Sequence, residues 1–234
     1  MQDALARRSR ERPDNLAERI YLQLKADIFD FRLLPGDRFS ETEVAERMAA
    51  SRTPVRQALY RLEREGYLQV YFRSGWQVRP FDFQHFEELY DVRIVLELAA
   101  VNRLCLMEAT THPLLETLKE VWLVEECERL SDPQVVSGLD ESFHCALVQT
   151  TDNREMARMH YEITEKIRII RRLDFTQQAR IAATYDEHAR ILDAILQRRS
   201  DQAQHLLKTH IEASKQAVRE ITLHRLHVAR QQLP

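Results

Sequence analysis

The spacing of apolar residues along the chain predicts a mainly α-helical protein. Between residues 41 and 66, two short segments place apolar side chains every three to four positions, which is the period of an amphipathic helix. The positions with this spacing are Val44, Ala45, Met48, Val55, Leu59 and Leu62. Residues 67–72 and 76–79 instead alternate apolar and polar side chains, which predicts two strands joined by a turn at 73–75.

Residues that commonly begin and end helices bound these two segments. Ser40 and Glu43 have the spacing of a capping box before the first helix. Ser51 can cap the second helix, and Pro54 falls in its first turn, where a missing N–H does no harm. Gly66 can close that helix. Two helices joined by a tight corner and followed by a ribbon are typical of a winged helix-turn-helix, which binds duplex DNA.

The charge of this segment favours the same function. Residues 47–79 contain seven arginines and two glutamates, whereas the whole chain has a net charge of −3. Such a local basic patch favours DNA contact over the alternative of a solvated, arginine-rich helix face. An arginine at the start of the second helix can bond bidentately to guanine, which is worth about 1–3 kcal/mol of discrimination. The residues expected at the DNA are Arg52, Thr53, Arg56, Thr42, Arg73 and Gly75.

The chain beyond residue 80 has the pattern of six further helices. It contains a single glycine, Gly138, and few β-branched runs, which favours helix. Cap residues and prolines predict helices at about 82–109, 113–130, 133–151, 153–173, 176–198 and 200–228. The apolar residues expected to face inward on the first of these are Leu89, Val92, Val95, Leu96 and Ala99. Short connections predict an antiparallel bundle of six to seven helices.

Length and charge divide the chain near residue 80. A chain of 234 residues is long enough for two domains, and residues 1–80 carry a net charge of +3 against −6 for residues 82–234. We expect a disordered, arginine-rich arm at 1–13, a winged helix-turn-helix domain at 14–80 and an all-helical domain at 81–234.

Composition indicates the compartment. The three cysteines, an odd number, are expected to be free thiols in a reducing cytoplasm. No run of 18 apolar residues and no apolar signal core occurs, so we expect a cytoplasmic protein with no membrane segment, associated with the nucleoid when it is bound to DNA.

Three predicted helices carry a carboxylate and three imidazoles on apolar faces. Asp140 and His144 are four residues apart and share one side of a helix, while His188 and His210 lie at helical spacing from apolar residues in two others. A divalent transition metal would satisfy these buried polar groups: Zn²⁺ fits best, and Ni²⁺, Mn²⁺ and Fe²⁺ also suit imidazole and carboxylate. The spacing alone favours the alternative that these are separate polar core residues, or that some of them are exposed, over a metal site. The histidines interpreted as surface or structural are His160, His205, His224 and His227.

Two parts of the chain resemble a known family. Residues 35–68 read PGDRFSETEVAERMAASRTPVRQALYRLEREGYL and resemble the DNA-binding domain of the GntR family of bacterial transcription regulators, most specifically in SRTPVRQAL. The segments DESFHCAL and YDEHARILDAILQRRSDQAQHLLKTHI resemble the helical effector-binding (FCD) domain of FadR-type members. The resemblance implies that base and phosphate contacts come from Arg52, Thr53 and Arg56, and that a metal is held by Asp140, His144, His188 and His210.

The chain departs from the family pattern in the turn between the two DNA-binding helices. The family usually has glycine where this chain has Ala49 and Ala50, and it often has glutamate at the position of Gln57. An alanine in this turn must either keep a negative φ or accept strain of about 1 kcal/mol.

The resemblance also implies a ligand-responsive regulator. A sugar acid, hydroxy acid or dicarboxylate would bridge the metal and a cation, for which Arg93 is the first candidate and Arg180 the second, with Tyr185 lining the same site. One reading helix per chain predicts a homodimer on a palindromic operator, and we expect a repressor that the acid releases. Two alternatives remain: the metal is itself the signal, or the protein is a metallohydrolase, which the lack of a general base at motif spacing disfavours.

Overall fold

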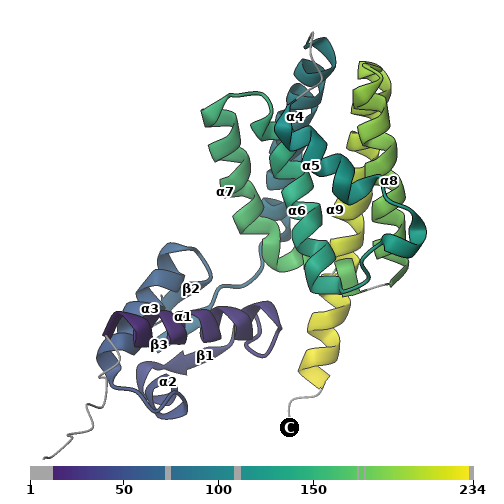
Figure 1. Ribbon diagram of the computed structural model, residues 1–234. Coiled ribbons are helices and arrows are strands. Elements are labelled where there is room, and N and C mark those ends of the chain that lie inside the picture. Colours follow the sequence, from purple (N-terminus) through teal and green to yellow (C-terminus); the bar gives the residue numbers. More distant parts are fainter. Residues whose placement is uncertain (1–12, 72–74, 108–111, 173, 177, 232–234) are drawn as a thin grey trace, which may run out of the picture. The chain divides into compact units, whose positions relative to one another are not determined.

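The computed structural model describes residues 13–71, 75–107, 112–172, 174–176 and 178–231 (Figure 1). It consists of two compact units, of which the first ends at Phe81 and the second spans Asp82–Gln231. The described residues form nine α-helices and one three-stranded sheet, which confirms the predicted mainly α fold. The expected N-terminal arm lies outside the described residues except for Pro13, the first residue of a helix.

The first unit is a helical head with a small antiparallel sheet. Its elements are α1 (Pro13–Phe29), β1 (Arg38–Ser40), α2 (Glu41–Arg47), α3 (Arg52–Arg64), β2 (Leu68–Tyr71) and β3 (Gly75–Val78). The strand order is β1-β3-β2, so β3 pairs with both of the others. The long helix α1 packs along α3 and contributes Ile20, Leu24 and Ile28 to the core. The sequence pattern did not predict α1 or β1 as separate elements.

Local signals at the helix ends act as predicted. The Ser40 hydroxyl accepts a hydrogen bond from the Glu43 backbone N–H at 3.2 Å, and the Glu43 carboxylate accepts one from the Ser40 N–H at 2.6 Å, which completes the capping box. Ser51 is the N-cap residue of α3, although its side chain makes no capping bond. Gly66 has φ +86° directly after α3, a conformation that glycine adopts without strain.

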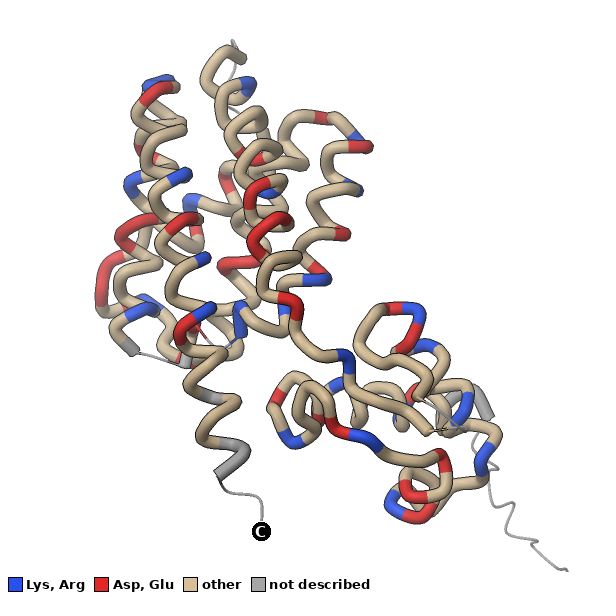
Figure 2. Tube along the Cα trace, turned by 180° about the vertical axis from the view of Figure 1, so that it is seen from behind, with Lys and Arg blue, Asp and Glu red and all other residues tan. Residues whose placement is uncertain are grey.

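The second unit is a bundle of helices. Its elements are α4 (Phe83–Leu106), α5 (Pro113–Trp122), the short 3-10 turn η1 (Glu126–Glu128), α6 (Pro133–Gln149), α7 (Arg154–Arg171), the 3-10 turn η2 (Asp174–Thr176), α8 (Gln178–Leu196) and α9 (Ser200–Gln231). Helix α4 packs most extensively against α9 and also contacts α6, α7 and α8 (Figure 1). Acidic positions exceed basic ones from residue 82 onward, by a net charge of −6 (Figure 2). None of the described helices combines the length and the apolar character that crossing a bilayer requires.

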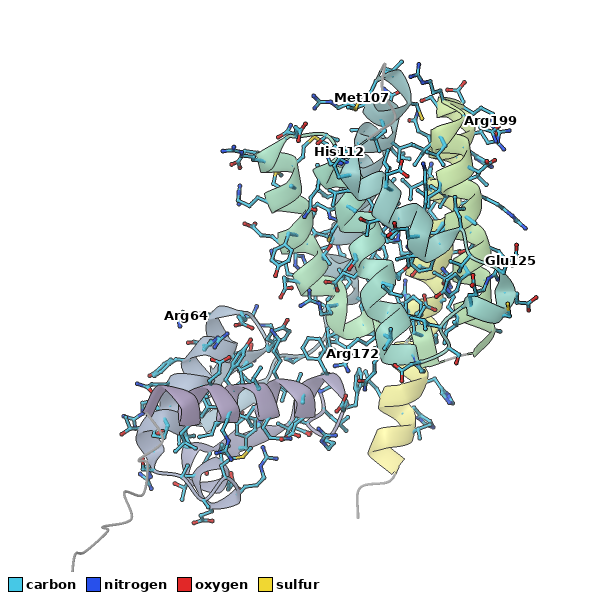
Figure 3. All side chains as sticks on the ribbon, viewed as in Figure 1. Arg64, Met107, His112, Glu125, Arg172 and Arg199 are labelled. Atoms are coloured by element: carbon cyan, nitrogen blue, oxygen red, sulfur yellow. The ribbon has the colours of Figure 1, made fainter. Side chains whose placement is uncertain are left out.

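Helix α5 is shorter than predicted. It ends at Trp122, whereas the pattern predicted a helix to about residue 130. The residues that follow include Glu125, Glu126 and Glu128, and Glu125 is exposed beyond the helix end (Figure 3). Carboxylates near a helix C-terminus oppose the helix dipole, which favours termination here even though no glycine or proline occurs.

Helix α4 is oriented differently from the prediction. Leu89 is buried as expected, but Arg93 and Glu97, which are 1% and 0% exposed, occupy the interior in place of part of the apolar stripe. The members of that stripe that instead face solvent are Val92, Val95 and Ala99. A 2.6 Å salt bridge joins Arg93 to Glu97, and this pairing offsets part of the cost of burying both charges.

Candidate functional site

The start of α3 presents the residues predicted to read DNA. Arg52, Thr53 and Arg56 are all exposed on its first turns. Residues at the start of α2 hold the two arginines: the Arg52 guanidinium donates to the Thr42 hydroxyl at 2.9 Å, and the Arg56 guanidinium donates through Nε and Nη2 to Glu41 at 3.0 and 2.9 Å. The hydrogen bond from Arg56 lowers the pKa of Glu41. The sequence reasoning had not identified Glu41 as a member of this surface.

The backbone angles of the turn between α2 and α3 show which of its two alanines is strained. Ala49 has φ +47°, in the left-handed region, and its N–H bonds to the Glu46 carbonyl at 3.2 Å. The turn therefore keeps the geometry that glycine allows, and Ala49 carries the strain of about 1 kcal/mol. Ala50 does not have a positive φ. At the ribbon, Gly75 begins β3, whereas Arg73 lies outside the described residues.

In the second unit, the four predicted metal ligands converge from three helices. Asp140 and His144 lie on α6, His188 on α8 and His210 on α9, and all four are buried. The Oδ1 atom of Asp140 is 3.6 Å from His144 Nε2 and 3.4 Å from His188 Nε2. His210 Nε2 is 3.2 Å from His144 Nε2 and 3.4 Å from His188 Nε2.

The spacing of these donor atoms fits a single ion. Ligand atoms bonded at about 2.0–2.2 Å to a common ion are separated by at most about 4.4 Å. One ligand atom from each of the four residues can be chosen so that all lie within 4.8 Å of one another. A movement of a few tenths of an ångström therefore suffices for all four residues to reach one ion.

Two carboxylates orient the imidazole rings of this cluster. Glu97 accepts a hydrogen bond from His144 Nδ1, and Glu187 accepts one from His210 Nδ1, each at 2.6 Å. Because a carboxylate only accepts, the Nδ1 atom of each ring carries a proton, and the two Nε2 atoms face one another 3.2 Å apart. Facing lone pairs repel unless a cation lies between them. Such an arrangement of donor atoms could hold a metal ion.

The other two candidate ligands are held by different contacts. Asp140 turns its second oxygen to the Arg171 guanidinium, and that contact is a buried salt bridge. The His188 ring stacks on Phe143 with centroids 3.8 Å apart and meets the edge of Trp122 at 4.2 Å. Its Nδ1 atom is buried without a hydrogen-bond partner in the described part of the chain. Aromatic packing on one side and the Asp140 carboxylate at Nε2 therefore hold this ring.

Burial and pairing keep the cluster in the protonation state that a metal requires. Burial lowers the pKa of His210 to about 4 and that of His188 well below its usual value, so both rings are neutral at neutral pH. Burial alone would raise the pKa of Asp140, but the Arg171 guanidinium and the neighbouring imidazoles hold it well below its usual range. Metal ligands must be deprotonated in this way.

The predicted effector residues lie around this cluster at different distances from it. Arg93 reaches it through Glu97, which binds both Arg93 Nε and His144 Nδ1 at 2.6 Å. The Nη1 and Nη2 atoms of Arg93 are buried and have no hydrogen-bond partner among the described residues. Arg180 binds Glu187 at 3.0 Å, and its Nη2 is 3.4 Å from His210 Nδ1.

Tyr185, the third predicted effector residue, is connected to the cluster through Trp122. Its ring packs on Trp122 at 4.8 Å, one ring removed from His188, and its hydroxyl accepts the backbone N–H of Leu130 at 3.1 Å. It therefore anchors the segment after η1.

Three further buried groups were missed by the sequence reasoning: Glu97, Arg171 and Asp174. The histidine expected to be surface or structural at position 160 is buried and bonded to Glu97 at 2.9 Å. Of these residues only Glu97 has a signal in the sequence, because it lies four residues after Arg93 and so shares a helix face with it.

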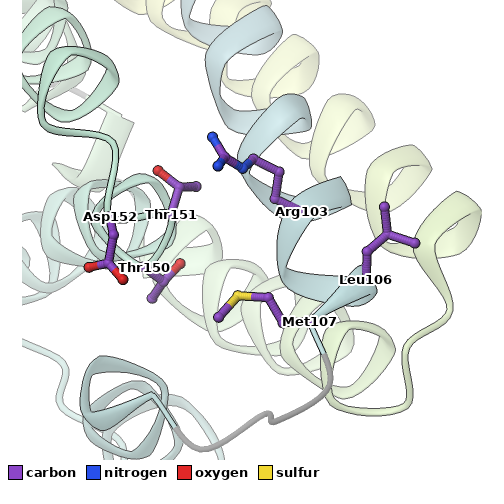
Figure 4. A pocket seen from close by; sticks show the side chains of 6 residues that line it. All are labelled: Arg103, Leu106, Met107, Thr150, Thr151 and Asp152. Atoms are coloured by element: carbon purple, nitrogen blue, oxygen red, sulfur yellow. The ribbon is translucent and has the colours of Figure 1, made fainter.

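The helical unit also contains a cleft that is separate from the cluster of candidate metal ligands. It has a volume of about 350 Å³ and is lined by Arg103, Leu106, Met107, Thr150, Thr151 and Asp152 (Figure 4). None of the predicted metal or effector residues lines it.

Most of the chain is similar to known proteins. Residues 16–78 match the bacterial regulatory proteins of the gntR family, and residues 88–213 match the FCD domain. The HTH-type transcriptional regulator YdhC of Bacillus subtilis is 31% identical over 203 residues, which is 84% of this chain and 88% of the relative. The Nta operon transcriptional regulator of Aminobacter aminovorans is 30% identical over 192 residues, covering 82% and 89% of the two chains.

Solved structures show the same fold. The protein Lar, described as controlling the Listeria monocytogenes agr system, superposes with a TM-score of 0.65 at 18% identity, covering 88% of this chain and 97% of that one. A GntR regulator from Rhodococcus sp. RHA1 gives 0.63 at 23% identity, covering 87% and 97%. The curated relatives at 30% identity or more are named transcriptional regulators, so the metallohydrolase alternative is set aside. The chain belongs to the GntR family of bacterial transcription regulators, with a winged helix-turn-helix head and an FCD domain, and it is not an enzyme.

Proposed function

We propose that this regulator senses a small carboxylic acid at a metal held by Asp140, His144, His188 and His210. The observation that carries the proposal is the convergence of four buried ligand atoms, with the Nε2 lone pairs of His144 and His210 turned inward. A divalent transition ion bound there, with Zn²⁺ the best match and Ni²⁺, Mn²⁺ and Fe²⁺ alternatives, supplies a Lewis acid with open positions for a carboxylate oxygen.

The charges around the cluster favour an anionic effector. The charged groups at the cluster are Asp140, the carboxylates Glu97 and Glu187, the arginines Arg93, Arg171 and Arg180 that contact these three, and Asp174, which contacts Arg180. Their formal charges leave one negative charge in excess, and a divalent ion reverses it to one positive charge. A monocarboxylate neutralises this remaining charge, and a sugar acid or hydroxy acid also offers hydroxyls to the polar groups of the site.

Arg93 is the residue that would bind the carboxylate of the effector. Its Nε is used by Glu97, while Nη1 and Nη2 are buried with no partner among the described residues. An unpaired buried guanidinium edge is costly, and a bidentate carboxylate matches it in shape and charge. Arg180 is the second candidate, since it already binds Glu187 and approaches His210.

The effector would act on DNA binding through a homodimer. One reading helix per chain matches a palindromic operator read as two half-sites by Arg52, Thr53 and Arg56, with Thr42 and the Arg73–Gly75 turn as supporting contacts. The acid shifts the balance between two arrangements by its difference in affinity for them. Release of the operator in the cytoplasm, hence repression, is the expected response. The relative RspR of Escherichia coli, 25% identical over 210 residues, is named a transcriptional repressor.

A thermal-shift screen of metal-loaded protein against small carboxylic acids tests this function. An acid present at 100 times its Kd stabilises the fold by about 2.7 kcal/mol. His188→Leu replaces a ligand by an apolar residue of similar volume between Phe143 and Trp122, so it should lose metal and acid response while remaining folded. The exposed His205→Leu is the matched control and should retain both. Full metal content in His188→Leu would refute the site.

The metal as the signal is the second candidate. The facing Nε2 atoms of His144 and His210 favour it, because without a cation their repulsion favours separation of α6 and α9. Titration of Zn²⁺ into chelated protein, with operator affinity measured at each step, distinguishes the two. If the metal alone switches operator binding and no acid changes it further, the acid-sensor function is wrong.

A further inference from the structure

One side of α4 faces solvent although it is largely apolar. It carries Glu88, Val92, Val95, Ala99, Arg103 and Leu106, which we call the outer face of α4. These positions are spaced by three or four residues and so lie on one side of the helix. Val92, Val95 and Leu106 are 44%, 66% and 73% exposed. The remaining sides of α4 are occupied by α6, α7, α8 and α9. The outer face is therefore a largely apolar stripe, and the exposed polar residues Asp91 and Asn102 border it.

The outer face has an internal symmetry. About the point midway between Val95 and Leu96, Val92 is the mirror position of Ala99, and Glu88 is the mirror position of Arg103. The apolar centre thus has an acid at one end and a base at the other, at equal distances from the midpoint. A helix with this pattern is complementary to a second copy of itself that runs in the opposite direction.

The charged ends are available for such a contact. The side chain of Glu88 is 62% exposed, and its contacts within α4 are long: 3.8 Å to His85 Nδ1 and 3.4 Å to Gln84 Nε2. Arg103 is exposed near the other end of α4, where its side chain also lines the cleft with Thr151 and Asp152 (Figure 4). From Glu88 to Arg103 the helix rises about 22 Å at 1.5 Å per residue, which is long enough for four turns of helix-on-helix packing.

We propose that the outer face of α4 is the surface on which a second copy of this chain docks, antiparallel and about a twofold axis through the Val95–Leu96 midpoint. The inference deepens the proposed homodimer by naming its surface and register. A twofold interface requires a self-complementary patch, and this face has one. Val92 of one copy lies against Ala99 of the other, and Glu88 of each copy pairs with Arg103 of the other, so the ion pair occurs twice.

The oligomeric state of the full chain tests the surface. Sedimentation velocity across a micromolar concentration series should show a dimer for the wild type and a monomer for Val95→Arg, with an unchanged helical circular dichroism signal. Val135→Arg is the matched control, because Val135 is also an exposed valine, on α6, and that variant should remain dimeric. A monomeric wild type, or a Val95→Arg variant that dimerises like the wild type, would overturn the proposal.

A charge exchange tests the register. Glu88→Arg places two arginines together at each end of the interface, and Arg103→Glu places two carboxylates together, so each should weaken dimerisation by at least about tenfold. The double variant Glu88→Arg/Arg103→Glu restores opposite charges and should return to within about threefold of the wild-type Kd. No recovery in the double variant would overturn the antiparallel pairing. These measurements involve neither DNA nor metal, so they stand or fall independently of the effector function.

Discussion

Replacing Glu97 by glutamine is the sharpest test of the buried charge network. Glu97 is fully buried and accepts three hydrogen bonds, from Arg93 and His144 at 2.6 Å and from His160 at 2.9 Å. Burial alone would raise its pKa, but Arg93 and His144 hold it well below its usual range, so the group is a carboxylate at neutral pH. Glutamine has the same shape, lacks the charge and presents an NH₂ group to one side.

The expected cost follows from these contacts. Removing one partner of a buried ion pair costs about 3–5 kcal/mol, and because glutamine keeps one accepting oxygen we expect the lower end, about 3 kcal/mol. For a unit of this size that corresponds to a fall in Tm of about 6–12 °C. If the new NH₂ group faces His144, that ring must move its proton to Nε2. Metal affinity should then fall by about ten- to a hundredfold.

Two measurements check this prediction. Urea denaturation of the metal-free protein gives the change in unfolding free energy, and competition with a metal-binding dye gives the change in affinity. Glu116→Gln, at an exposed glutamate of α5, is the control and should change neither. A Glu97→Gln protein within about 0.5 kcal/mol of the wild type would refute the reasoning that this carboxylate stabilises the cluster.

Three further predictions concern the head and the pH dependence of stability. Arg56→Ala should lower specific operator affinity by about ten- to a hundredfold in fluorescence anisotropy, while its exposed salt bridge to Glu41 contributes at most about 1 kcal/mol to stability; unchanged affinity removes Arg56 from the reading surface. Ala49→Gly should be about 1–2 kcal/mol more stable in urea denaturation than Ala50→Gly, because only position 49 has a positive φ; equal stabilities contradict the strain. His210 has its pKa lowered to about 4 by burial, against about 6.5 when unfolded, so the unfolded chain takes up the proton first. Metal-free protein should therefore lose about 3 kcal/mol of stability as the pH falls from about 6.5 to 4, and a flat profile across that window excludes this group as the cause.

The sequence predicted the elements whose local signals agree with their packing. The capping box at Ser40, the start of α3 after Ser51 and its end at Gly66 all follow from backbone chemistry that does not depend on the rest of the fold. The convergence of Asp140 with His144 also follows from the helix period, because residues four apart share a face whatever packs against them.

The orientation of α4 shows why the buried charged residues of the second unit could not be predicted from the sequence. Pattern reasoning assigned Val95 to the interior and did not identify Glu97, yet Val95 is outside and Glu97 is inside beside Arg93. Charged residues become tolerable in a core when partners from other helices neutralise them, and here those partners, His144 on α6 and His160 on α7, are distant in sequence. No single helix contains that information. The end of α5 at Trp122 was missed for a related reason, since no residue there prevents helix and only the following carboxylates oppose it.

The position of Trp122 gives this protein a built-in optical reporter. The chain has two tryptophans, and the two units hold one each: Trp76 is buried under Tyr60 in the head, and Trp122 lies 4.2 Å from the His188 ring. Indole emission depends on nearby charge and polarity, so occupancy of the imidazole cluster changes the light from one tryptophan and duplex docking changes the light from the other. Replacing either indole by phenylalanine would separate the two signals, so that the proposed ligand capture and operator release could be timed on unlabelled protein.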